Sequence, residues 1–128
     1  MPIEVSINDE GFETDSLDEL RTHLARLQEN QFSEVWLTPS DGWPTLTALV
    51  NGSAAWLMYM RYEGDAGFST RNPNYVGPEA AMVEYQLCNG QMDEYPASWN
   101  ITTPEAVRAM EHFFVTLERP PWLSWHAH

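Results

Sequence analysis

The residues of this sequence that could carry out catalysis are one cysteine, four histidines and many carboxylates. A nucleophilic Cys88 would need a histidine base and a further group that orients that base. Nothing in the sequence places His23 or His112 beside Cys88, and a lone cysteine at the end of a strand more often packs as a small hydrophobic residue. We therefore do not expect Cys88 to act as a catalytic nucleophile.

Two of the histidines, His126 and His128, are two residues apart near the end of the sequence. A structural or catalytic metal site needs at least a third ordered ligand, and the spacing indicates none. The sequence also contains no HExxH or CxxC motif and no glycine pattern of a phosphate-binding or dinucleotide-binding loop. We expect neither a metal site nor a cofactor.

The acidic residues do not define a catalytic pair. A glycosidase needs two carboxylates that face each other across a cleft, and 19 Asp and Glu residues offer many pairs without selecting one. The expectation is a protein that is not an enzyme. A small hydrolase with an unrecognised pair of carboxylates stays open as an alternative.

Three short stretches place acidic residues beside aromatic rings, a pattern that suits protein binding. Aromatic side chains are frequent anchors at interfaces, and carboxylates around them steer a basic partner. In each stretch the ring could instead belong to the core, with the acids facing water. The predicted partner-binding residues are Asp41, Trp43, Glu63, Asp65, Phe68, Asp93, Glu94 and Tyr95.

The formal net charge is −13, from 19 acidic residues against six arginines and no lysine. Such a charge repels nucleic acid and anionic lipid and attracts basic protein surfaces. The alternative that the acidity serves only solubility stays open.

Two hairpins are expected to position these stretches. Residues 44–50 and 53–62 flank Asn51-Gly52, and residues 80–88 and 91–99 flank Asn89-Gly90. Asn-Gly is the pair preferred in two-residue hairpin turns because both residues tolerate positive φ. Further strands are predicted at residues 3–7 and 34–38.

Two amphipathic helices are expected. The first, over residues 16–28, has Ser16 and Glu19 as a capping box and buries a leucine stripe. The second has Thr103 as its N-cap and Pro104 at its first helical position. The two stripes predicted to face the core are Leu17, Leu20, Leu24 and Leu27, and Val107, Met110, Phe114 and Leu117, with Phe113 alongside.

Pro120 and Pro121 cannot continue the second helix, so the chain is expected to return as a short extended piece in which Trp122 or Trp125 packs on the sheet. The predicted fold class is α+β, an antiparallel meander sheet with two main helices against one face and a short C-terminal strand. Residues 1–128 are expected to form a single domain. The sequence shows no apolar run of membrane-spanning length and no secretory signal, so a cytoplasmic protein is expected.

The second helix carries a double aromatic and is followed by Arg-Pro and then by a tryptophan. The residues concerned are Phe113, Phe114, Arg119, Pro120 and Trp125. This pattern resembles the C-terminal signature of immunity protein family one of bacterial polymorphic toxin systems. The early leucine-rich helix, the central hairpin and the entry to the second helix agree in kind, so the resemblance spans almost the whole chain.

The resemblance implies a non-enzymatic immunity protein that binds the C-terminal domain of a cognate toxin and occludes its active site or substrate groove. Members of this family are often paired with nucleic-acid deaminases, so a cytidine deaminase is the expected target. The expected partner is therefore a basic, nucleic-acid-acting domain, with no direct binding to nucleic acid or membrane. The alternative is an acidic nucleic-acid mimic that inhibits another basic enzyme, such as a nuclease.

Overall fold

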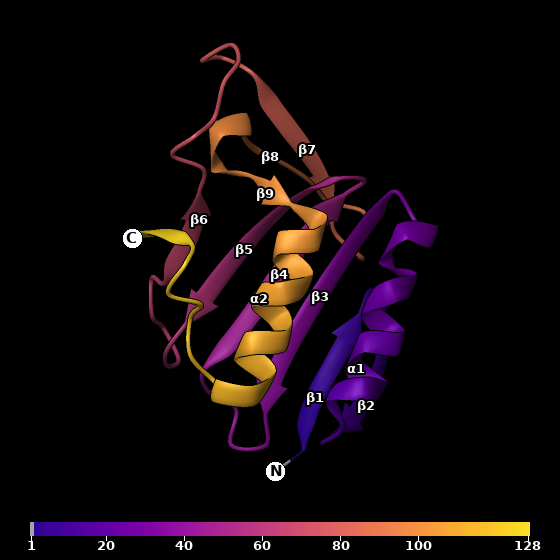
Figure 1. Cartoon of the computed structure of the whole chain (residues 1–128). Coiled ribbons are helices and arrows are strands. Elements are labelled where there is room, and N and C mark those ends of the chain that lie inside the picture. The colour runs from indigo at the N-terminus through magenta and orange to yellow at the C-terminus, as the bar shows by residue number, and fades with distance from the viewer. Residues whose placement is uncertain (1) are drawn as a thin grey trace.

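Residues 2–128, which the computed structural model describes, form two α-helices on one face of a large antiparallel sheet and a two-stranded sheet on the other (Figure 1). The predicted α+β class is confirmed, including both helices on one face and a short strand after the second helix. Within these residues, neither helix has the length and apolar character needed to cross a membrane.

The large sheet has the strand order β10-β6-β5-β4-β3-β1-β2, and β9 pairs with β5. Its strands are β1 (Ile3–Ile7), β2 (Glu10–Thr14), β3 (Phe32–Pro39), β4 (Thr45–Asn51), β5 (Ala54–Met60), β6 (Phe68–Arg71), β9 (Ile101–Thr102) and β10 (Ser124–Ala127). The small sheet is the hairpin of β7 (Met82–Gln86) and β8 (Met92–Pro96). The helices are α1 (Leu17–Leu24), continued by a 3-10 turn over Ala25–Glu29, and α2 (Thr103–Thr116); a second 3-10 turn spans Ala97–Trp99.

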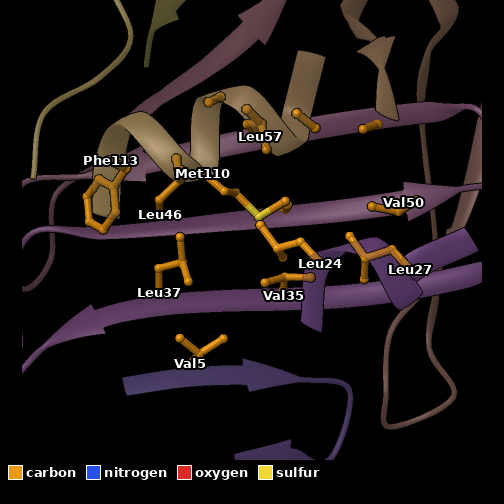
Figure 2. Packing of buried hydrophobic residues seen from close by; sticks show 14 of the residues in the cluster. Val5, Leu24, Leu27, Val35, Leu37, Leu46, Val50, Leu57, Met110 and Phe113 are labelled. Atoms are coloured by element: carbon orange, nitrogen blue, oxygen red, sulfur yellow. The ribbon is translucent and has the colours of Figure 1, made fainter. Parts of the chain in front are cut away.

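The main core lies between the large sheet and the two helices (Figure 2). Successive side chains of a strand point to opposite faces, so Val35 and Leu37 of β3 face the helices whereas Glu34 and Trp36 face away. Leu24 of α1 and Met110 of α2 lie over these strands and are almost fully buried. Each such side chain contributes about 1.5–3 kcal/mol by leaving water.

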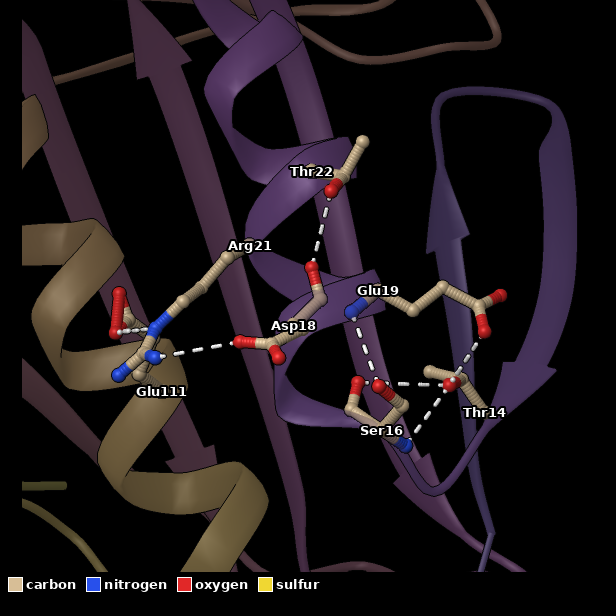
Figure 3. A network of polar contacts seen from close by, with 7 residues as sticks. All are labelled: Thr14, Ser16, Asp18, Glu19, Arg21, Thr22 and Glu111. Carbon is tan, nitrogen blue, oxygen red and sulfur yellow. Dashed lines mark hydrogen bonds and ion pairs between the residues drawn. The ribbon is translucent and has the colours of Figure 1, made fainter.

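The start of α1 confirms half of the predicted capping box and replaces the other half (Figure 3). The Ser16 side chain accepts a hydrogen bond from the backbone N–H of Glu19 at 3.2 Å, as expected. The Glu19 carboxylate does not return to the backbone of Ser16 but accepts from the Thr14 hydroxyl at 3.0 Å. The backbone N–H of Ser16 donates to Thr14 Oγ1 instead, at 3.0 Å, so the last residue of β2 completes the cap.

The N-cap of α2 is Thr102, one residue earlier than predicted. Thr102 and Glu105 form a reciprocal capping box, with distances of 3.2 and 3.0 Å. Thr103 was expected as the cap because it precedes Pro104, but its hydroxyl donates to the backbone oxygen of Gly52 at 2.8 Å. This bond ties the first turn of α2 to the β4–β5 hairpin.

The buried face of α2 is rotated relative to the predicted stripe. Its fully buried residues include Ala106, Ala109, Met110 and Phe113, whereas Val107, Phe114 and Leu117 are only partly buried. The two alanines allow the helix to approach the sheet closely, and their small side chains explain why the search for large apolar residues missed them.

Both predicted hairpins form, but neither has Asn-Gly as its two-residue turn. Asn51 pairs with Ala54, so the turn residues are Gly52, with φ of +57°, and Ser53; glycine at the first central position is typical of type II′ turns. In the β7–β8 hairpin, Leu87 N–H donates to the Gln91 oxygen at 2.8 Å, which leaves a three-residue loop that ends in Gly90, with φ of +91°.

Three strands were not predicted, and the second hairpin does not join the large sheet. β2 was missed because its sequence EGFET is mostly polar, and β6 and β9 because they have only four and two residues. β7 and β8 pair with each other alone and pack on the second face of the large sheet. There Leu49, Trp56 and Tyr85 form a separate buried cluster.

The chain after α2 turns earlier than the prolines require. α2 ends at Thr116, and Leu117 adopts a left-handed conformation with φ of +60°. Of the two tryptophans offered for packing, it is Trp125 that packs: it lies against the main core and its Nε1 donates to the Pro120 oxygen at 3.0 Å. Trp122 is 53% exposed.

Candidate partner-binding surfaces

Five of the eight predicted binding residues lie at one end of the large sheet. They are Asp41, Trp43, Glu63, Asp65 and Phe68. The first two belong to the β3–β4 connection, the next two to the β5–β6 connection, and the last begins β6. Because Thr45 at the start of β4 pairs with Met60 at the end of β5, both connections leave the sheet at the same end.

The Asp65 carboxylate is held within its own loop. It accepts hydrogen bonds from Arg61 Nε at 2.9 Å and Arg61 Nη2 at 3.0 Å, and from the backbone N–H groups of Arg61 and Gly67. The Arg61 guanidinium and these backbone bonds hold the pKa of Asp65 well below its usual range. Only 4% of the Asp65 side chain is exposed, so this residue shapes the loop, whereas Glu63 is exposed.

Phe68 is covered by two cations. The guanidinium carbon of Arg119 lies 3.6 Å from the ring centroid and that of Arg61 4.9 Å, distances at which a cation is attracted to an aromatic face. A basic partner that approached Phe68 would therefore meet like charges. This end of the sheet suits a basic partner less well than its carboxylates alone suggested.

The other three predicted residues, Asp93, Glu94 and Tyr95, lie on β8 and do not share a face. The Tyr95 ring stacks on Trp56 of β5, with ring centroids 4.3 Å apart, and helps fix the hairpin to the sheet. Asp93 pairs with Tyr85, which is fully buried, so Asp93 points toward the same inner side. Glu94 points to the outer side and is exposed.

The outer side of the hairpin carries residues that the sequence analysis did not select. Met82, Glu84 and Gln86 of β7 alternate with the inward residues of that strand, and Met92 and Glu94 do so on β8. We call these five residues the hairpin face; all five are exposed, Met82 by 48% and Met92 by 47%. The alternation in MVEYQ and MDEYP could have identified them, since a half-buried strand shows this period.

The six arginines are unevenly distributed. They are Arg21, Arg26, Arg61, Arg71, Arg108 and Arg119. Residues 72–107, which include the hairpin, therefore contain no lysine or arginine, but they carry the carboxylates Glu79, Glu84, Asp93, Glu94 and Glu105. The hairpin is thus a strictly anionic part of the chain.

Glu34 fixes the turn of the hairpin to the large sheet. Its two carboxylate oxygens accept from the Trp36 indole N–H at 2.7 Å and from the backbone N–H of Cys88 at 3.0 Å. Burial opposes ionisation of Glu34, but these hydrogen bonds outweigh it and hold its pKa below the usual range. Trp36, 36% exposed, is thereby oriented beside the hairpin turn.

The candidate nucleophiles have no catalytic surroundings. Cys88 is exposed, and its neighbour is Glu34, which raises the pKa of the thiol by hydrogen bonding; a reactive cysteine requires the opposite shift. Ser69 Oγ lies 2.6 Å from His128 Nε2, but Ser69 has no exposed surface and presents no nucleophile to a substrate. Within residues 2–128 no cluster of three or more side chains could hold a metal ion.

Comparison with protein families gives one match, over nearly the whole chain. The family described as Immunity protein Imm1 matches residues 9–127. No curated protein matches the chain. The matched range includes both helices, both hairpins and every residue of the signature from Phe113 to Trp125.

Proposed function

The chain belongs to the Imm1 family of immunity proteins, and from this premise we propose that it binds and neutralises a nucleic-acid deaminase that forms the C-terminal domain of a cognate toxin. Family membership makes it an immunity protein with a toxin as its partner. The observation that carries the finer proposal is the net charge of −13 without a single lysine. A toxin that acts on nucleic acid needs a basic substrate groove, for which an acidic protein can compete.

We propose that inhibition is by occlusion of the active site or of the substrate groove, in the cytoplasm, with residues 1–128 acting as one domain and without catalysis. The acidic field favours fast capture, and steered association can reach about 10⁸ M⁻¹s⁻¹ or more at low salt. Slow release requires contacts that exclude water, because charges at the rim of an interface are screened by salt and change mainly the association rate.

The eight residues predicted from the sequence stay predictions of this interface. Asp41, Glu63 and Glu94 are exposed and support a role in steering. Asp65, Phe68 and Tyr95 are held by contacts within the protein, which supports a role in shaping the surface rather than in touching the toxin.

The test is calorimetric titration of the chain with the C-terminal domain of the toxin encoded beside it, in a catalytically disabled form. A one-to-one complex of about nanomolar affinity, typical of specific inhibitors, is the expected result. Deamination of DNA and RNA by the active toxin domain, measured with and without the chain, then tests the proposed chemistry. A toxin that does not deaminate would reject the deaminase while leaving the immunity role in place.

A nuclease is the second candidate target, because the same charge supports competition with any basic nucleic-acid enzyme. Cleavage of nucleic acid by the active toxin domain, abolished by an equimolar amount of the chain, would favour this candidate. Binding to several unrelated basic enzymes, displaced by polyanions, would instead indicate a general nucleic-acid mimic.

A further inference from the structure

We propose that the hairpin face (Met82, Glu84, Gln86, Met92 and Glu94) is the surface on which the toxin domain docks, and that the toxin contacts it with lysine or arginine side chains. The inference rests on the proposed function, since it assigns the toxin contact to one part of the molecule. It differs from the interface predicted from the sequence, with which it shares only Glu94.

The hairpin face is an unpartnered sheet face with an apolar component. The inner side of the same two strands is used in the fold, where Tyr85 is fully buried and Val83 packs beside it. On the outer side, Met82 and Met92 lie at opposite ends of the two-stranded sheet with about half of their surface exposed. Methionine is flexible and polarizable, and such side chains adapt to a partner's surface.

Between the two methionines, Glu84 and Glu94 occupy directly opposed positions of the ladder. Like charges at such positions destabilise a sheet, and within residues 2–128 neither carboxylate has a hydrogen-bond or ion-pair partner. A lysine or arginine brought between them would convert this repulsion into two charge-assisted hydrogen bonds. The arrangement therefore fits a cationic occupant.

The charges nearby decide between possible occupants. Residues 72–107 contain no lysine or arginine, so nothing on the hairpin itself competes with a cation from the partner. A second copy of this chain is disfavoured, because joining two hairpin faces would bring four carboxylates together. At the other end of the sheet, Arg61 and Arg119 cover Phe68, so a basic surface fits the hairpin face better than that end.

The hairpin is held firmly enough to serve as a preformed docking surface. Asn51 Nδ2 donates to the backbone oxygen of Glu84 at 2.9 Å, and Glu34 accepts from Cys88 N–H at the turn. Tyr95 stacks on Trp56 from the inner side. A surface that is ordered before binding loses less conformational entropy on association, which favours affinity.

The test compares two variants that lose the same charge. One carries Glu84→Gln with Glu94→Gln, and the control carries Glu63→Gln with Glu118→Gln, both exposed residues outside the hairpin. Association with the disabled toxin domain is followed by stopped flow at several salt concentrations. We expect the hairpin variant to associate about three- to tenfold more slowly at low salt, with a weaker salt dependence, and the control to stay within about twofold of the wild type.

A second variant, Met82→Ala with Met92→Ala, tests the apolar part and should dissociate about tenfold faster while its circular dichroism spectrum and melting temperature stay close to the wild type. If the wild type binds the toxin and both hairpin variants bind with wild-type rates, the docking assignment is overturned although the proposed function stands. A wild-type chain that does not bind the toxin overturns both. A dimer of the chain alone that the methionine variant dissociates would also overturn the assignment, in favour of a second copy as the occupant.

Discussion

The segment from Phe113 to Trp125 and the β7–β8 hairpin both place aromatic residues against the large sheet, yet they differ in what they leave for a partner. In the first, Phe113 is fully buried, Arg119 stacks on Phe68, and the Trp125 indole donates to Pro120. In the hairpin, only the inner side is engaged. The residues by which the family is recognised therefore build the fold, and the residues suited to binding lie elsewhere.

This difference separates membership of the family from choice of partner. A signature made of internal contacts identifies relatives with the same architecture, but it says nothing about which toxin each one binds. The outer side of the hairpin makes no contacts that the fold requires, so its residues can vary with the partner. The comparison can be tested by changing each region in turn.

The largest expected effect is that of Phe113→Ala. Removal of a fully buried aromatic ring leaves a cavity in the main core and should lower the free energy of unfolding by about 3–5 kcal/mol, measured by urea denaturation. Under conditions where the variant is still folded, its association rate with the toxin should be unchanged. A folded variant that had lost toxin binding would place the signature within the interface and break the comparison.

Glu34→Gln should have a smaller but distinct effect. Glutamine can offer only one oxygen where two donors point, so either the Trp36 or the Cys88 N–H loses its acceptor, at a cost of about 1–3 kcal/mol. Because the folded-state pKa of Glu34 is lowered, its contribution is present above the unfolded-state pKa of about 4.3 and is lost as pH falls through the folded-state pKa. Thermal melts at pH 7 and at decreasing pH should show the gap between wild type and variant closing below about pH 4; a gap that does not depend on pH would contradict the ionised latch.

Asp65→Asn should destabilise less, because its partner Arg61 is half exposed to solvent and the ion pair is screened. We expect a lower melting temperature and an unchanged association rate with the toxin, measured side by side with Glu63→Gln. A large decrease in the association rate would mean that the loop meets the toxin directly and that the end of the sheet is part of the interface.

The smallest expected change in stability is that of Glu84→Gln, and its sign is the informative part. Relief of the repulsion from Glu94 should raise the free energy of unfolding by about 0.2–1 kcal/mol, although the same change slows capture of the toxin. Denaturation and binding kinetics on one preparation decide the matter, and a variant that is both less stable and equally fast would show that the opposed pair does not act as argued here.

Much of this fold could be predicted from short-range chemistry. The leucine stripe of α1 and the helix-stopping prolines follow from local spacing, and the alternating strands around two turns gave both hairpins. What failed depended on contacts distant in sequence. Thr102 rather than Thr103 caps α2 because Thr103 is bonded to Gly52, and the second hairpin stands apart because Tyr85 and Tyr95 need the second face of the sheet as their partner.

The predicted binding residues show the same limit. An acid beside an aromatic ring in sequence says little about whether the acid is free, since Arg61, four residues before Asp65, binds its carboxylate. On β8, adjacent residues alternate between the two sides of a strand, so Asp93 and Glu94 cannot share one surface. Strand alternation would have selected Glu84 and Glu94 together, but only the register of the hairpin shows that they are directly opposed.

Amide hydrogen exchange of the chain, free and saturated with the disabled toxin domain, tests the central claim most directly. The account predicts that slowed exchange on binding is concentrated in residues 82–96, with residues 113–125 unchanged. Protection confined to residues 61–68 and 117–127, with the hairpin exchanging as in the free protein, would contradict it.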